Sequence, residues 1–221
     1  MRAFALLPMG TIVTRNYQTD GAAIYRQSFT IIRAEADLSA FPPALERVVV
    51  RMIHACGMTD LPAYVSATPG FAEIGIQALR NGAPILCDSR MVADGITRSR
   101  LKANNEIVCT LDHRETPEIA RRLQTTRSAA ALELWRDRLG GSVVAIGNAP
   151  TALFHLIDML EQGAPKPALV VGIPVGFVGA AESKAALQQQ GEALPHITVM
   201  GRRGGSAMAA AAINALASEE E

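Results

Sequence analysis

The sequence predicts a single α/β domain in which a mostly parallel sheet of about five or six strands lies between layers of helices. Short apolar runs alternate with segments of helical periodicity along most of the chain. The predicted strands begin roughly 20 to 35 residues apart, which leaves room for a crossover helix each time. Continuous apolar runs, such as residues 169–171, are typical of strands buried on both faces. The 221 residues are enough for one domain with a large core.

We expect residues 1–19 to form an N-terminal arm, residues 20–217 the α/β domain, and residues 218–221 a short tail. Asp20 is expected to cap a first helix of residues 21–35. A second helix follows the prolines at 42 and 43 and ends at Gly57, a residue suited to the left-handed conformation at which helices commonly end. The predicted strands are residues 63–66, 84–88, 106–111, 142–146, 168–173 and 196–200. The remaining predicted helices are residues 69–81, 89–94, 117–139 with an interruption at 125–126, 150–162, 180–190 and 206–217.

The second predicted helix carries the polar residues that most suggest chemistry. Arg47, Arg51 and His54 share one face because they stand four and three residues apart. A histidine in a last turn lies at the negative end of the helix dipole, which favours imidazolium and would suit a proton donor. The same spacing also fits a surface histidine beside solvated arginines. Cys56 belongs instead to the apolar stripe of this helix.

The first predicted helix sets Ser28 into an apolar stripe, where its hydroxyl either faces a ligand or bonds back to a helix carbonyl. Polar and glycine-containing loops follow four of the predicted strands, and in α/β folds ligands lie beyond such carboxyl ends. Free N–H groups at helix starts there would attract anions, and Asn148 is expected to cap the helix that Pro150 begins. Turns and caps alone would also explain the composition of these loops. The loops are residues 88–90, 147–151, 172–179 and 201–206.

The composition and the motifs argue against several classes of protein. The 21 basic and 21 acidic residues give a net charge of zero, which argues against a nucleic-acid or polybasic membrane surface. No apolar run is long enough for a membrane span. Three cysteines without a C-x-x-C pair indicate reduced thiols in a cytoplasmic protein, and the four histidines lack metal-ligand spacing. The residues after Gly172 do not form a G-x-G-x-x-G motif, so a nucleotide-dependent oxidoreductase is a weak alternative.

Several long blocks resemble one family, the precorrin-8X methylmutases of cobalamin biosynthesis. They occur in family order from about residue 20 to residue 216, which is nearly the whole chain. The blocks are IYRQSFTIIRAEAD at 24–37, RMIHACG at 51–57, GAPILCD at 82–88, TRSAAA at 126–131, GNAPTAL at 147–153 and PVGFVGAAESK at 174–184.

The resemblance implies an isomerase without an organic or metal cofactor. Such an enzyme moves a methyl group on a corrinoid ring from ring carbon 11 to ring carbon 12, giving hydrogenobyrinic acid. His54 matches the family's proton donor and acceptor, and Ser28, Arg51, Thr97 and Arg127 match substrate-binding positions. The family also implies a homodimer. A carrier that binds corrinoid without turnover stays open, as do a metal-free or cobalt-containing substrate and free release or hand-over of the product to the next enzyme.

Overall fold

A six-stranded sheet forms the centre of the protein in a computed structural model that describes residues 17–218. Most of the predicted arm and residues 219–221 of the predicted tail therefore lie outside the described residues. The strand order is β1-β6-β5-β4-β2-β3. All six predicted strands are confirmed, although each is shorter than expected. They are β1 (Val65–Ala67), β2 (Ile85–Cys87), β3 (Ile107–Val108), β4 (Val143–Ile146), β5 (Leu169–Gly172) and β6 (His196–Val199).

The pairing is mostly parallel, as the spacing of the strands predicts. The strands from β2 to β6 all run parallel to one another. At one edge of the sheet, β1 pairs antiparallel with β6. Every residue of β2, β4, β5 and β6 is buried, which agrees with strands covered on both faces.

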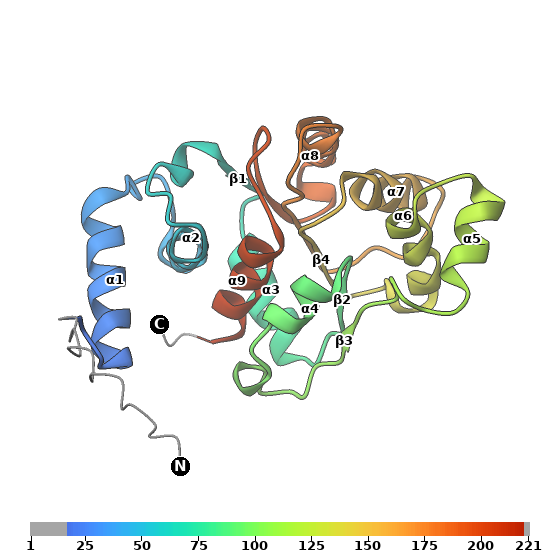
Figure 1. Cartoon of the computed structure of the whole chain (residues 1–221). Coiled ribbons are helices and arrows are strands. Elements are labelled where there is room, and N and C mark those ends of the chain that lie inside the picture. The colour runs from blue at the N-terminus through green and yellow to red at the C-terminus, as the bar shows by residue number, and fades with distance from the viewer. Residues whose placement is uncertain (1–16, 219–221) are drawn as a thin grey trace, which may run out of the picture.

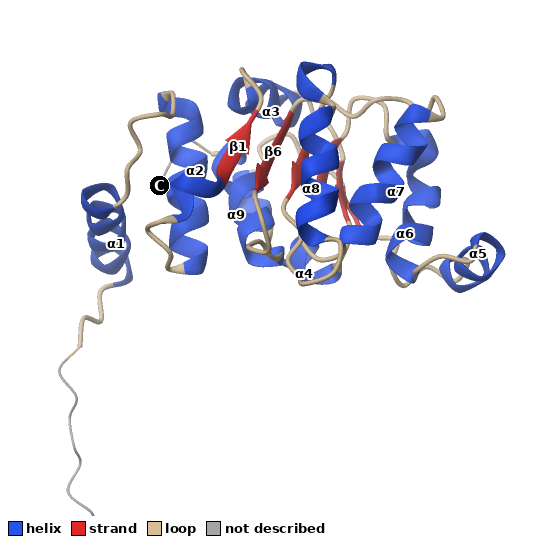
Figure 2. Cartoon of the chain, turned by 90° about the horizontal axis from the view of Figure 1, so that it is seen from above, coloured by secondary structure: helices blue, strands red, loops and turns tan. Residues whose placement is uncertain are grey.

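Helices cover both faces of the sheet, as Figure 1 shows. The larger core cluster joins one face to α2, α3, α4 and α9, and the smaller joins the other face to α7, α8 and the 3-10 segment η3. The turned view in Figure 2 places α1 and α2 at one end of the molecule and α5 and α6 at the other. The helices are α1 (Gly21–Glu35), α2 (Pro43–Cys56), α3 (Phe71–Arg80), α4 (Arg90–Gly95), α5 (Thr116–Leu123), α6 (Arg127–Ala131), α7 (Pro150–Glu161), α8 (Ala180–Gln189) and α9 (Ser206–Ala217); the 3-10 segments are η1 (Leu61–Tyr64), η2 (Arg98–Arg100), η3 (Leu132–Arg138) and η4 (Gly191–Ala193).

The expected helix ends at the N-terminal side are confirmed. The Asp20 carboxylate accepts hydrogen bonds from the N–H groups of Ala22 at 2.9 Å and Ala23 at 3.2 Å, so it caps α1. Gly57 ends α2 in the left-handed conformation with φ 69°, and its N–H donates to the carbonyl of Ile53. The helix predicted at 117–139 is broken as expected and becomes α5, α6 and η3.

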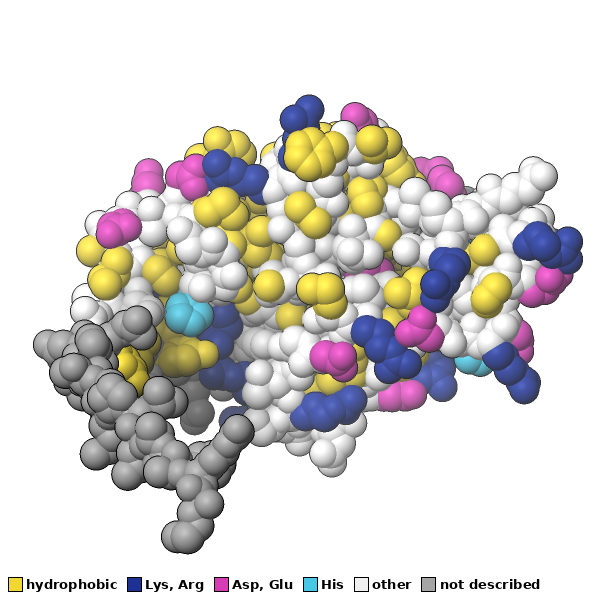
Figure 3. Space-filling model, in the orientation of Figure 1, with side chains coloured by type: hydrophobic (Ala, Val, Ile, Leu, Met, Phe, Trp, Pro, Cys, Tyr) yellow, Lys and Arg dark blue, Asp and Glu magenta, His cyan; other side chains and the backbone are white. Residues whose placement is uncertain are grey.

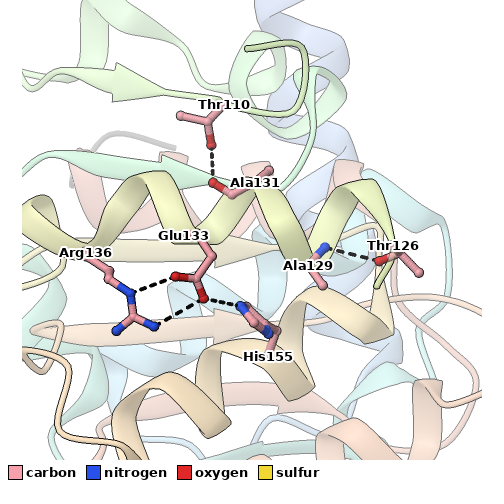
Figure 4. A network of polar contacts seen from close by, with 7 residues as sticks. All are labelled: Thr110, Thr126, Ala129, Ala131, Glu133, Arg136 and His155. Atoms are coloured by element: carbon pink, nitrogen blue, oxygen red, sulfur yellow. Dashed lines mark hydrogen bonds and ion pairs between the residues drawn. The ribbon is translucent and has the colours of Figure 1, made fainter. Parts of the chain in front are cut away.

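A polar network joins η3 to α7 on the face of the sheet opposite α2 (Figure 4). The Glu133 carboxylate accepts hydrogen bonds from Arg136 at 2.7 and 3.2 Å and contacts Nε2 of His155 at 2.7 Å. Burial pushes the pKa of Glu133 upward, but the hydrogen bonds and charges of Arg136 and His155 outweigh it, so the pKa falls below its ordinary 4.5.

This network makes the stability of the fold depend on pH. Because the pKa of Glu133 is lower in the folded state, its ionised form stabilises the fold above about pH 4.5, and this stabilisation is lost as the pH falls through the folded value. We expect Glu133→Gln to lower the free energy of unfolding by about 1–3 kcal/mol at pH 7 and by less at pH 4.

Urea unfolding at both pH values measures the effect. Glu118→Gln is the matched control, because Glu118 makes a similar pair with Arg121 but its side chain is 63% exposed. The control should change the unfolding free energy by about 0.5 kcal/mol or less. Equal losses in the two variants would contradict a special contribution from Glu133.

Candidate active site

His54 lies in the last turn of α2, half-buried against two aromatic rings of α1. The centroid of its imidazole is 5.0 Å from the Tyr25 ring and 5.1 Å from the Phe29 ring. The two aromatic residues stand one turn apart on α1, with their own centroids 5.7 Å apart. The histidine is therefore held where the first two helices meet, not as a freely solvated surface residue.

Arg51 lies one turn before His54 and is 9% exposed. Its guanidinium carbon is 5.6 Å from the centroid of the Phe29 ring, which is within the range of a cation–π contact. Ser28, beside Phe29 on α1, is half-buried. Within the described residues it forms no bond back to a helix carbonyl; Thr30 forms such a bond instead, to Arg26 at 2.9 Å. A bond back to a helix carbonyl therefore does not account for the Ser28 hydroxyl within the described residues.

The prediction that the helix end favours a protonated His54 is wrong. Burial lowers the pKa of His54 below its ordinary 6.5, and the positive charge of Arg51 lowers it further. These two effects outweigh the attraction of the helix end for a positive charge. The neutral imidazole is therefore the favoured form near pH 7 in the free protein.

A hollow of about 700 Å³ borders the aromatic pair. Figure 3 shows this face of the molecule, with basic side chains gathered in a depression between the N-terminal helices and the body of the domain. No acidic side chain is among the residues that line it. One of the arginines, Arg33, is paired with Glu46 at 3.3 Å. The lining residues are Ala22, Tyr25, Arg26, Phe29, Thr30, Arg33 and Arg100.

The arginine at position 47 differs from expectation. Arg47 is half-buried rather than solvated, and its Nε atom is buried with no hydrogen-bond partner. A buried guanidinium nitrogen without an acceptor is energetically costly. Arg47 adds to the positive charge that α2 carries on the face shared by Arg51 and His54.

The structure brings together some of the expected site residues and separates others. Ser28, Arg51 and His54 meet at the contact of α1 with α2. Thr97 precedes η2, whose Arg100 lines the hollow, and the Thr97 N–H donates to Asn214 at 2.8 Å. Arg127 begins α6, at the opposite end of the molecule from α2 in both views, and pairs with Asp112 at 2.9 Å.

The loops at the carboxyl ends of the strands do not form the expected anion site. The buried Asp88 carboxylate accepts the N–H groups of Gly147, Asn148 and Ala149 at 3.1, 2.9 and 2.8 Å, so a group of the protein itself occupies the start of α7. Asn148 is not the helix cap either, because Ala149 holds that position and Pro150 follows it. The hollow is lined by α1 and η2 instead.

Two further loops are tied to each other in the same way. The N–H of Gly205 donates to the carbonyl of Ile173 at 2.9 Å, and buried Lys184 donates to the carbonyl of Arg203 at 2.7 Å. Burial lowers the pKa of Lys184 to about 8. These bonds fix the two loops against each other.

No group of histidine, cysteine and acidic residues that could hold a metal ion occurs within residues 17–218. In the same range, no helix is both long and apolar enough to cross a membrane. The cysteines at 56, 87 and 109 are free thiols, and Cys56 packs against the core as its place in the apolar stripe predicts.

Comparison with known proteins identifies the family. The model of the precorrin-8X methylmutase family matches residues 23–219. The chain belongs to this family. It is an isomerase of cobalamin biosynthesis, as the resemblance implies.

Methylmutase relatives and a solved methylmutase structure support the assignment along nearly the whole chain. A precorrin-8X methylmutase of Pseudomonas aeruginosa is 60% identical and covers 93% of this chain and 99% of its own. A cobalt-precorrin-8 methylmutase of Leptospira interrogans is 37% identical over 89% of this chain and 92% of its own. The crystal structure of a precorrin-8X methylmutase from Thermus thermophilus superposes with a TM-score of 0.81 at 42% identity, covering 89% of this chain and 95% of that one.

Reasoning from the sequence missed part of this methylmutase site. Tyr25, Phe29 and Arg100 were not predicted as site residues. Two aromatic residues four apart on the helix before His54 were a usable signal, because such residues share a face. The arginines of the hollow were not foreseeable, since only the fold brings α1 close to η2.

Proposed function

We propose that this methylmutase moves the methyl group from ring carbon 11 to ring carbon 12 of precorrin-8X, giving hydrogenobyrinic acid, with His54 as the residue that donates and recovers a proton. The observation that carries the proposal is the place of His54 against the rings that border an arginine-lined hollow. His54 does not itself line this cavity, but it contacts two side chains that do, so a polycarboxylate ring bound there would lie close to the imidazole.

The proton cycle follows from the charges around the imidazole. A proton delivered to the conjugated macrocycle makes the ring electron-poor and lowers the barrier to methyl migration, and His54 then takes the proton back. In the free enzyme Arg51 disfavours imidazolium. A substrate carboxylate bound to Arg51 would cancel that charge and raise the pKa of His54, so that binding itself would promote protonation. The cycle leaves the enzyme unchanged, and we include no cofactor in it.

Binding in this proposal relies on arginine. A corrinoid substrate carries many carboxylates, which guanidinium groups bind through paired hydrogen bonds. Arg51 and the arginines of the hollow would take these groups, and the Ser28 hydroxyl and Thr97 would position the substrate at the same side. We place this activity in the cytoplasm and assign it to residues 20–217 as one unit.

The role of His54 is testable with one substitution. We expect His54→Ala to slow the rearrangement by about 10²–10⁴-fold while corrinoid binding stays nearly unchanged. The visible spectrum of precorrin-8X mixed with purified protein measures both conversion and binding. The control is His113→Ala, because His113 is exposed and stands three residues before α5, which lies at the opposite end of the molecule from α1 in Figure 1.

Other outcomes would favour the competing functions. Tight binding by the wild-type protein without conversion would leave the carrier as the better interpretation. Measurable affinity for NAD(P) by calorimetry would support an oxidoreductase. Wild-type turnover in His54→Ala would contradict the proton-transfer role. Slow product release in the same assay would favour direct hand-over to the next enzyme.

We further propose that the natural substrate is metal-free. Identity to the Pseudomonas aeruginosa relative, which is named for precorrin-8X, is 60%, against 37% to the Leptospira interrogans relative named for the cobalt form. We expect kcat/KM for precorrin-8X to exceed that for cobalt-precorrin-8 by at least about tenfold, a modest difference in transition-state binding. Parallel assays with both forms measure it, and a preference for the cobalt form would contradict the proposal.

A homodimer is also part of the proposal, since Arg127 lies at the opposite end of the molecule from His54. If Arg127 binds substrate, a second subunit must supply it. The outer side of α1 offers a surface for such a contact, because Ile24, Tyr25 and Ile31 are 41–44% exposed there. In a twofold dimer, α6 of one subunit would meet α1 and α2 of the other and complete both sites.

Mixing two inactive variants tests this arrangement. His54→Ala and Arg127→Ala should each be inactive alone, but a mixed dimer would contain one site with both native residues. After unfolding and refolding of an equal mixture, we expect about a quarter of wild-type activity, since half of the dimers are mixed and each has one intact site. Gel filtration measures whether the protein and each variant are dimers. Recovery no greater than the sum of the separate variants would contradict a shared site.

A further inference from the structure

The His54 ring lacks the usual means of orientation. Catalytic histidines are commonly fixed by a hydrogen bond from one ring nitrogen to a carboxylate or a carbonyl. Within the described residues no hydrogen bond acts on the His54 imidazole, whose pKa is set by burial and by Arg51 alone. Its closest defined contacts are the two rings of α1, inclined to it by 41° for Tyr25 and 31° for Phe29.

These two rings are held in different ways. Phe29 is 5% exposed and belongs to the main core cluster, so its ring is fixed from the inside, with the Arg51 guanidinium packed against it. Tyr25 is 44% exposed and lines the hollow. The imidazole thus contacts one ring that is fixed in the core and one ring that lines the hollow.

We propose that Tyr25 and Phe29 are positioning residues for His54, which hold its imidazole toward the hollow and exclude water from its faces. The pair replaces the carboxylate or carbonyl that would otherwise orient the ring. Phe29 contacts both the imidazole and the Arg51 guanidinium. The effect on turnover rests on the proposed proton-transfer role of His54, whereas the effect on the imidazole itself does not.

Among the causes that lower the pKa of His54, burial is the largest, and the two rings contribute to this burial. Arg51 on α2 is the charged group that lowers this pKa, Arg47 lies two turns before His54 on the same helix, and Arg26 of α1 lines the hollow. α9, the main helix packed against α2, has no titratable side chain. The titratable groups of the other neighbouring elements face elsewhere, namely Glu73 and Arg80 on α3, which line other hollows, and Tyr64 on η1, which lies under Arg203.

The experiment compares Tyr25→Ala with Tyr25→Phe. In protein with labelled histidine rings, NMR titration reports the pKa of His54, whose signal is assigned by its loss in His54→Ala. We expect Tyr25→Ala to raise that pKa toward 6.5, because water reaches the imidazole, and to lower kcat about tenfold with little change in KM. Tyr25→Phe keeps the ring and should keep the wild-type pKa of His54.

Thermal unfolding shows whether each variant is folded, and Phe29→Leu provides a second removal of a ring should Tyr25→Ala fail to fold. An unchanged His54 pKa in Tyr25→Ala would overturn the proposal. Equal effects of the Phe and Ala substitutions would also overturn it, because the hydroxyl and not the ring would then matter. If His54→Ala keeps its turnover, the proposed function fails, but the titration still decides whether the rings shield His54.

Discussion

The packing of α9 against the sheet is the constraint on which the position of the active site depends. Ten of its twelve residues are buried, and it contacts β4, β5 and α2. Its small side chains allow close approach: a Cβ at Gly95 would lie 2.7 Å from Ala210, and one at Gly147 would lie 2.8 Å from Ala209. α2 packs on this narrow helix through fully buried valines, so the end that carries His54 is set rigidly relative to the sheet.

α1, unlike α2, is attached to the rest of the domain by few buried residues. Phe29 and Ile32 are its buried residues, and it packs on α2 at the edge of the molecule. Little of the apolar surface of α1 is therefore buried, and Phe29 contributes both to this packing and to the contacts of Arg51 and His54. The residue that attaches the helix is thus the residue that shapes the site. A weakly attached helix beside a rigid one is a suitable wall for a hollow that must admit a large ring.

The sequence was sufficient for most of the architecture because strong local signals agreed with each other. Alternating apolar runs placed all six strands, and Asp20 and Gly57 marked helix ends through side-chain and backbone effects that act within a few residues. The site was only partly foreseeable. The Asp88 carboxylate reaches the start of α7 from another strand, and such long-range bonds leave no periodic pattern in the sequence. The low pKa of His54 also arises from tertiary burial, which competes with the local helix dipole and prevails.

The charge distribution explains how a protein of zero net charge can take up a polyanionic ring. Its basic and acidic residues are equal in number, yet the hollow is lined by three arginines and by no acidic residue. Acidic side chains pair with arginines both at this hollow, as Glu46 does with Arg33, and elsewhere, as Glu118 does with Arg121. Burial is the larger cause of the lowered pKa of His54, and the charge of Arg51 adds to it. Under the proposed function, a substrate carboxylate at Arg51 would offset only the second cause, so substrate binding and protonation of the imidazole would be coupled through that one charge.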